Sequence, residues 1–241
     1  FCPNLPFHGY RYIEFPGLDE PLPVENVRML VLSSLDATVT YETSNELVNR
    51  LFANIVNSTT SNFVDLPTDC PQRDERMGWT GDAQVFCATA SMHMNTDAFF
   101  RKYLTDLAIE QEKRGYVPVT VPNILYETGI WQFPVTGWGD AATVIPWTLY
   151  LHYGDRAVLE KQYPSMKAWV QFMQSQDTLK ADRYYQFSLG DWLAQDTKDP
   201  NNFSGLTPTD LISTAYYALS AGITAKAAAV LGYQEDAEAY G

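Results

Sequence analysis

The sequence predicts a mainly α protein, a partial α/α toroid of helical hairpins preceded by a few β-strands. Apolar and polar residues alternate with a period of two over the first forty residues, which is typical of half-buried strands. From residue 43 onward the apolar residues recur at helical spacing instead. The expected helices are joined alternately by short turns and by long loops rich in charged and aromatic residues, as a ring of hairpins with its long loops on one face requires.

Composition indicates a globular protein that binds a neutral ligand. The chain of 241 residues is 46% hydrophobic and 19% charged, so it can bury a large core. Its net charge of −13 argues against nucleic acid and anionic membranes as partners, because phosphate groups are bound chiefly by clustered Lys and Arg. No apolar run approaches the roughly 20 residues that cross a bilayer.

Cysteine and histidine spacing predicts neither a metal site nor a cofactor. The cysteines follow no metal-ligand spacing and no disulfide framework, so we expect buried free thiols. The histidines are scattered without paired spacing, which favours core or surface positions. These residues are Cys2, Cys70, Cys87, His8, His93 and His152.

A first domain is expected at residues 1–42. Strands are predicted at 10–15, 27–32 and 37–41, and turn signals such as Pro16-Gly17 separate them. The chain opens without a Met or a signal-peptide pattern and closes on residues that read as the start of a helix. We therefore expect a piece of a longer protein.

Helix signals divide residues 43–241 into hairpins. Thr43 and Glu46 form a capping box that starts the first helix. Pro164 is expected to break the helix that Asp155 opens, because proline lacks an amide N–H and disfavours helix in the residue before it. The other predicted boundaries are caps at Thr80 and at Asn95 or Thr96, stops at Gly115, Gly154 and Gly232, helices at about 139–153 and 209–231, and long loops at 64–79, 116–138 and 179–207.

The segment 69–82 carries the strongest chemical pattern. It combines carboxylates, guanidinium groups and an indole with a proline and glycines that prevent a continuous helix. Cleavage of a glycosidic bond needs one protonated carboxylic acid and a second carboxylate, about 6.5–9.5 Å away in inverting enzymes and about 5–5.5 Å away in retaining ones. Sequence does not measure that distance. The candidate acids are Asp69, Asp74, Glu75 and Asp82.

Glu75 is the predicted general acid. Met77 and Trp79 offer an apolar surface that would raise the pKa of a neighbouring carboxyl group. This prediction requires the guanidinium groups of Arg73 and Arg76 to turn toward other carboxylates.

Each of these residues also has a structural explanation. Asp82 falls in the first turn of a helix, whose dipole keeps carboxylates ionised, so it suits hydroxyl binding or simply a helix end. The alternating charges of 73–76 are typical of a solvated salt-bridge patch. Trp79 and Trp192, taken singly, would more often be core residues. Their occurrence together favours a sugar site.

Segments 69–76 and 78–82 resemble the signature of bacterial α-L-rhamnosidases of glycoside hydrolase family 78. Further matches lie at 10–12, 137–142, 146–147 and 190–192, so the similarity spans nearly the whole chain. The resemblance implies a six-hairpin (α/α)6 barrel preceded by β-sandwich domains. Residues 1–42 would then be the last strands of a sandwich, and residues 43–241 the N-terminal half of the barrel. It also implies hydrolysis of terminal α-L-rhamnosyl linkages with inversion, without a cofactor.

The resemblance assigns a role to each matching position. Glu75 would be the general acid, and the family's general base, a glutamate of the later hairpins, would follow residue 241. We therefore expect residues 1–241 alone to catalyse nothing. The implied partner is a rhamnose-containing glycoside or oligosaccharide, and the sequence leaves a homodimer, the compartment and the aglycone preference open. The implied rhamnose contacts are Asp69, Arg73, Trp79, Asp82, Trp138 and Trp192.

Three alternative functions remain open at this point. A non-catalytic carbohydrate-binding domain would use the same acids and indoles to hold a sugar. A purely structural helical domain would assemble with a partner through its aromatic loops. A toroidal glycosidase could also act on a different sugar.

Overall fold

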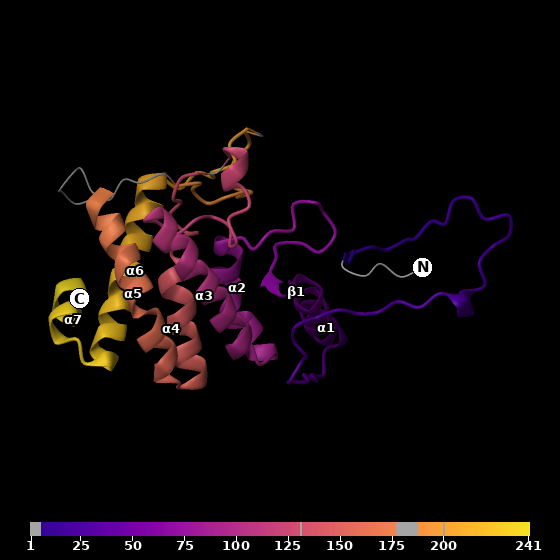
Figure 1. Ribbon diagram of the computed structural model, residues 1–241, viewed down its shortest axis with the longest axis horizontal. Helices are drawn as coiled ribbons and strands as arrows, with labels where there is room; N and C mark the ends of the chain where they lie inside the picture. Colours follow the sequence, from indigo (N-terminus) through magenta and orange to yellow (C-terminus); the bar gives the residue numbers. More distant parts are fainter. Residues whose placement is uncertain (1–5, 131, 177–187, 200) are drawn as a thin grey trace.

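The computed structural model describes residues 6–130, 132–176, 188–199 and 201–241, and within these residues the protein is mainly helical (Figure 1). This confirms the predicted fold class. The α-helices are α1 (Glu46–Asn62), α2 (Thr80–His93), α3 (Asp97–Arg114), α4 (Ala141–Tyr153), α5 (Arg156–Gln176), α6 (Thr209–Leu231) and α7 (Gln234–Tyr240), with 3-10 turns η1 (Val24–Asn26) and η2 (Tyr126–Thr128). Strands β1 (Phe63–Val64) and β2 (Leu66–Pro67) form a minimal antiparallel hairpin.

The helices from α2 to α6 pack in two layers. α4 contacts α2 on one side and α6 on the other, while α3 packs against α5. Figure 1 shows these helices side by side, with the turns from α2 to α3, from α4 to α5 and from α6 to α7 at one end of the bundle. The described parts of the long loops that follow α3 and α5 lie at the opposite end (Figure 1). This is the division that the alternation of short and long connections predicts.

One apolar core joins these layers. Its largest fully buried side chains include Trp169 of α5 and both Phe100 and Tyr103 of α3, each with no exposed surface. Burying an aromatic side chain of this size contributes about 1.5–3 kcal/mol relative to leaving it in water. Residues of α2, α4 and α6 complete the same cluster.

All three predicted glycine stops end helices as expected. Gly115, Gly154 and Gly232 follow α3, α4 and α6 and adopt positive φ angles of 76°, 70° and 86°. A residue with a Cβ atom rarely adopts this conformation, which lets the last carbonyls of a helix accept hydrogen bonds from the reversing chain.

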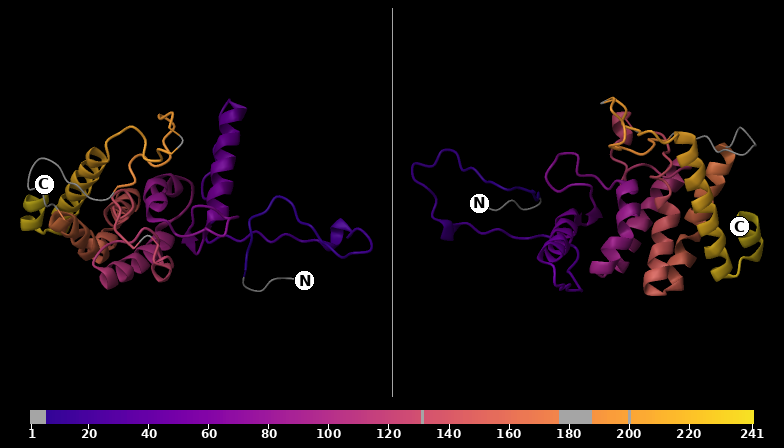
Figure 2. Two further views of the ribbon diagram at one scale, coloured as in Figure 1. Left: turned by 90° about the horizontal axis from the view of Figure 1, so that it is seen from above. Right: turned by 180° about the vertical axis from the view of Figure 1, so that it is seen from behind.

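The first helix begins differently from the prediction. Asn45 is its cap, because the Asn45 side chain accepts hydrogen bonds from the amides of Leu47 and Val48. Thr43 lies outside the helix and bonds Asn49 instead, so the predicted capping box is wrong. Figure 2 shows α1 standing apart from the layered helices and running across their direction.

The predicted break at Pro164 is also wrong, since α5 runs without interruption from Arg156 to Gln176. Proline inside a helix removes one hydrogen bond and costs about 3 kcal/mol. The buried side chains on both sides, Tyr163 and Met166 among them, anchor the helix to the core and offset that cost.

The strands predicted at 10–15, 27–32 and 37–41 are not formed. The described residues 6–42 run as extended chain away from the bundle, with η1 as their only helical turn and one isolated bridge from Ala37 to Met94 (Figure 1). A strand is stable only with a neighbouring strand to receive its backbone hydrogen bonds. Tyr12 and Val31 are each 82% exposed here, so their apolar pattern is unburied. Assignment of 1–42 to a β-sandwich domain stays a prediction.

Candidate active site

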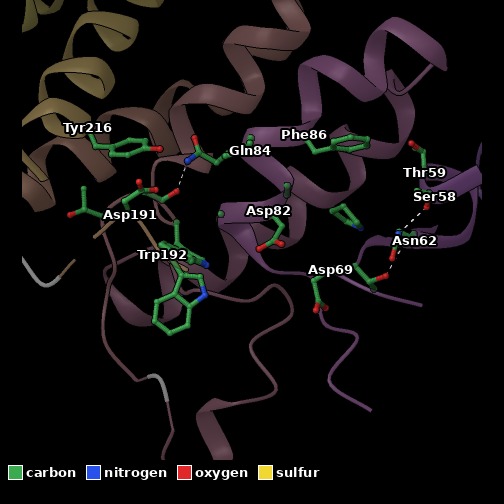
Figure 3. A pocket seen from close by; sticks show the side chains of 18 of the residues that line it. Ser58, Thr59, Asn62, Asp69, Asp82, Gln84, Phe86, Asp191, Trp192 and Tyr216 are labelled. Carbon is green, nitrogen blue, oxygen red and sulfur yellow. Dashed lines mark hydrogen bonds between the residues drawn. The ribbon is translucent and has the colours of Figure 1, made fainter. Parts of the chain in front are cut away.

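A cavity of about 520 Å³ lies where the N-terminus of α2 meets the long loops (Figure 3). Its volume falls within the roughly 300–1,000 Å³ that is typical of small-ligand sites. Carboxylates and aromatic side chains share its wall. They include Asp69, Asp82 and Asp191 together with Trp138, Trp192 and Tyr216.

Two isolated β-bridges bring the three long loops to this cavity. Trp79 pairs with Thr120, and Thr136 pairs with Ser188. A small buried cluster lies between the loops, with Trp79 and Trp138 packed against it. The members of the cluster are Val119, Val135 and Leu189.

The contacts of Gly78 and Thr80 explain why these residue types stand just before α2 and at its first position. A Cβ atom at Gly78 would lie 2.3 Å from the carbonyl oxygen of Val121, so only glycine allows the two backbones to approach. The Tyr103 hydroxyl donates to the Gly78 carbonyl at 3.0 Å. Thr80 is the first helical residue rather than the cap, and its hydroxyl donates to the carbonyl of Pro118 at 3.1 Å. These contacts fix the start of α2 beside the loop after α3.

Asp69 is held in place from two sides. Its Oδ2 accepts a hydrogen bond from Arg73 at 3.0 Å, and its Oδ1 accepts one from the Met77 amide at 3.1 Å. The side chain lines the cavity and is 9% exposed. Asp69 therefore presents a fixed acceptor at the cavity wall.

Glu75 lies beside the cavity rather than in its wall. Arg73 contacts it at 2.9 Å, so this guanidinium bridges Asp69 and Glu75. Arg76 does turn away, because it donates to the Phe7 carbonyl at 2.6 Å. The expectation that both arginines leave Glu75 is thus wrong for Arg73. The predicted acid therefore lies in an ion pair with Arg73 in this structure.

The Asp82 carboxyl faces the cavity (Figure 3), and its pKa is raised above its ordinary value. Removal of water around the group is the main cause, and the negative charges of Asp69 and Glu75 add to it. The helix dipole favours the ionised form of Asp82, whereas desolvation and the two neighbouring charges oppose it. Three carboxylates therefore lie close enough to influence one another.

Two indoles flank these acids. The Trp138 ring rests against Gly81, where an added Cβ atom would lie 2.8 Å from ring atoms Cε2 and Nε1. The Nε1 atom of Trp138 is buried and finds no hydrogen-bond partner among the described residues. Trp192 is 42% exposed, and its ring lies tilted by 44° to that of Phe203, with ring centroids 5.9 Å apart.

Other wall residues were not predicted from the sequence, among them Gln84, Asp191 and Tyr216. These three side chains gather on one side of Asp82 (Figure 3). Asp191 lies next to Trp192 in segment 190–192, which the family resemblance includes. That match could have identified Asp191 as a site residue. Gln84 and Tyr216 come from the middle of helices, and no local pattern marks them.

Of the sequence-predicted site residues, Asp69, Asp82, Trp138 and Trp192 line one cavity. The others, Arg73, Glu75 and Trp79, adjoin it through the contacts above. Fixed acceptors beside indole faces suit a neutral polyhydroxylated ring, because the acids take hydroxyl protons and the indoles cover C–H surfaces.

The cysteines behave as predicted where they are described. Cys70 and Cys87 are buried free thiols, and burial raises the pKa of Cys87 to about 11. Cys2 lies outside the described residues. Within the described ranges, no group of His, Cys, Asp and Glu is arranged to hold a metal ion, and no helix has the length and apolarity to traverse a lipid bilayer.

Comparison with known proteins points to one family. Residues 36–241 match the model of the bacterial alpha-L-rhamnosidase 6 hairpin glycosidase domain. The chain is 40% identical over 245 residues to an alpha-L-rhamnosidase of Alteromonas sp. (strain LOR) and 40% identical over 243 residues to one of Formosa agariphila. These alignments cover 100% of this chain and 26% of each relative, so the chain spans about a quarter of their length.

Solved structures show the same relationship. The native alpha-L-rhamnosidase of Aspergillus terreus superposes with a TM-score of 0.80 and 37% identity, over 92% of this chain and 26% of that one. The Streptomyces avermitilis alpha-L-rhamnosidase complexed with L-rhamnose gives a TM-score of 0.73 and 35% identity, over 87% of this chain and 19% of that one.

Proposed function

Because the chain belongs to the family of bacterial alpha-L-rhamnosidase six-hairpin glycosidase domains, we propose that the intact protein is a glycoside hydrolase that removes terminal α-L-rhamnose from glycosides or polysaccharides. The observation that carries this proposal is the cavity itself, with two predicted acids and two predicted indoles in one wall. The substrate is a rhamnose-containing glycoside, and the reaction uses no cofactor.

The wall suits the chemistry of this sugar. Rhamnose is a neutral deoxy sugar, so its hydroxyls need acceptors and its methyl group needs an apolar surface. Asp69 and Asp82 supply acceptors, and the buried Nε1 of Trp138 is a donor left for a ligand oxygen. The faces of Trp138 and Trp192 supply the apolar surface.

The proposed mechanism is inverting, with Glu75 as general acid. Glu75 gives a proton to the departing glycosidic oxygen, while a carboxylate on the opposite face takes a proton from the attacking water. That second carboxylate lies beyond residue 241 in this proposal. Arg73 would leave Glu75 and pair with Asp69 alone when the substrate binds.

The test compares Glu75→Gln with the wild-type intact protein, including any sequence that flanks these residues in its gene. Loss of a general acid lowers kcat by about 10²–10⁴-fold, and most for a poor leaving group. We expect a larger loss on an alkyl α-L-rhamnoside than on a 4-nitrophenyl one, with L-rhamnose affinity kept. Glu160→Gln is the matched control, because Glu160 also pairs with an arginine but lies on the outer surface.

The results separate the alternatives. Equal losses on both substrates would refute the role of Glu75, and proton NMR of the first-formed anomer tests inversion. Binding of L-rhamnose without any hydrolysis by the wild-type protein would favour a carbohydrate-binding domain. Cleavage of a different glycoside would identify a toroidal glycosidase for another sugar.

A further inference from the structure

A buried carboxylate lies behind the cavity and takes no part in the mechanism above. Asp140 immediately precedes α4 and has no exposed surface. Its Oδ1 accepts hydrogen bonds from Trp169 Nε1 at 3.1 Å and from Ser220 Oγ at 2.5 Å. Its Oδ2 accepts one from the Gly137 amide at 2.7 Å. Burial raises the pKa of Asp140, and these three donors oppose that change.

The bond to Gly137 connects this carboxylate to the cavity wall. Gly137 has a φ of 89°, which glycine adopts without strain, and Trp138 follows it directly. The carbonyl of Gly137 accepts a hydrogen bond from Gln84, itself a wall residue. The peptide groups on both sides of Gly137 are therefore fixed, one by Asp140 and the other by Gln84.

The donors to Asp140 come from different helices. Trp169 belongs to α5 and Ser220 to α6, so a single carboxylate relates two core helices to the loop that carries Trp138. The turn is closed further by the amide of Gly139, which bonds the Val135 carbonyl at 2.9 Å. The backbone from which the Trp138 indole projects is thus held from inside the bundle.

We infer that Asp140 is a positioning residue for sugar binding, which holds the Trp138 indole against Gly81 through the Gly137 amide. This inference rests on the proposed function, in which Trp138 contacts rhamnose. Asp140 itself touches no substrate, and its effect passes entirely through Trp138.

Asp140→Asn tests the inference with little change of shape. The asparagine amide offers one acceptor oxygen and one NH₂ donor in place of two acceptors. With its NH₂ toward Trp169 and Ser220, only the Ser220 hydroxyl can accept and the Trp169 N–H loses its acceptor; with its NH₂ toward Gly137, the Gly137 N–H loses its acceptor. Either way one buried N–H donor is left unsatisfied, which is costly. We expect the Gly137 turn to relax and the indole to move.

The experiment is a double-mutant cycle on L-rhamnose affinity, measured by calorimetry on the intact protein. We expect Asp140→Asn and Trp138→Ala each to weaken binding about tenfold or more, and the double variant to bind within about twofold of Trp138→Ala alone, because coupled residues are not additive. Ser165→Ala is the control, since it removes a buried hydrogen bond to Gln111 and neither residue lines the cavity, so affinity should stay unchanged.

A merely structural Asp140 would give a different result. The losses of affinity would then multiply in the double variant, and that result overturns the inference. Ser220→Ala is a milder variant that keeps the carboxylate, and we expect it to lose about twofold to fivefold in affinity only when Trp138 is present. Binding without hydrolysis by the wild-type protein would refute the proposed hydrolase while leaving this cycle decisive.

Discussion

Gly81→Ala is the most direct structural test of the Trp138 position. The new methyl carbon would lie 2.8 Å from Cε2 and Nε1 of the indole. Carbon atoms in contact normally lie about 3.5–4.0 Å apart, so the ring must move by roughly 0.8 Å. The methyl group would also cover the Nε1 atom that we assign to a ligand oxygen.

Two opposing effects determine the stability of Gly81→Ala. Overpacking costs about 1–3 kcal/mol, while replacing a helical glycine by alanine returns about 0.5–1 kcal/mol. We therefore expect the free energy of unfolding to fall by about 0–2.5 kcal/mol. The activity should fall much further, because misplacing a binding group by about 1 Å can cost about 10²-fold in rate.

The assay measures kcat/KM of the intact protein on 4-nitrophenyl α-L-rhamnoside. Urea denaturation of the same samples measures the free energy of unfolding. Gly222→Ala in α6 is the matched control, because nothing lies within 4 Å of the added Cβ atom. That control should gain about 0.5–1 kcal/mol of stability with unchanged kinetics. Wild-type kcat/KM in Gly81→Ala would refute the placement of Trp138 in the sugar site.

Three further predictions concern pH and packing. The raised pKa of Asp82 means that ionising this group destabilises the folded state, so Asp82→Asn should raise the unfolding temperature at pH 7, and the gain should vanish below the ordinary pKa of 3.8. Lys167 and, to a smaller extent, Tyr163 lower the pKa of Asp236, so Asp236→Asn should lower the unfolding temperature at pH 7. The difference from wild type should shrink as the pH falls below 3.8. Calorimetry from pH 3 to pH 7 checks the sign of the effect for both Asp82→Asn and Asp236→Asn. Gly139→Ala would place a methyl carbon 2.3 Å from the buried Trp169 ring and should cost about 1–3 kcal/mol or more, measured by urea denaturation.

The helices were predictable where local signals control their ends. Gly115, Gly154 and Gly232 each end a helix where predicted, because a positive φ angle is a property of the residue itself. The break predicted at Pro164 does not occur, since the cost of the proline is local whereas the core contacts that outweigh it come from other helices. The strands of 1–42 also failed, because strand formation depends on a partner edge that sequence does not locate.

Several residues that line the site were predictable from the sequence, but the charge interactions among them were not. Asp69, Asp82 and the two indoles share the cavity as the motifs indicated. The raised pKa of Asp82 and the bridge from Arg73 to Glu75 depend on distances between side chains, which no pattern of residues provides. Roles of individual residues, Glu75 above all, stay predictions.

The separation of short turns from long loops has an evolutionary consequence. The end of the bundle with the tight connections holds the helices in register, whereas the cavity is built at the other end from segments that carry little of the core. Loops at such positions accept insertions and exchanges far better than helices do. New substrate preferences can therefore arise by remodelling residues 188–208 or 115–140 while the scaffold beneath them keeps its architecture.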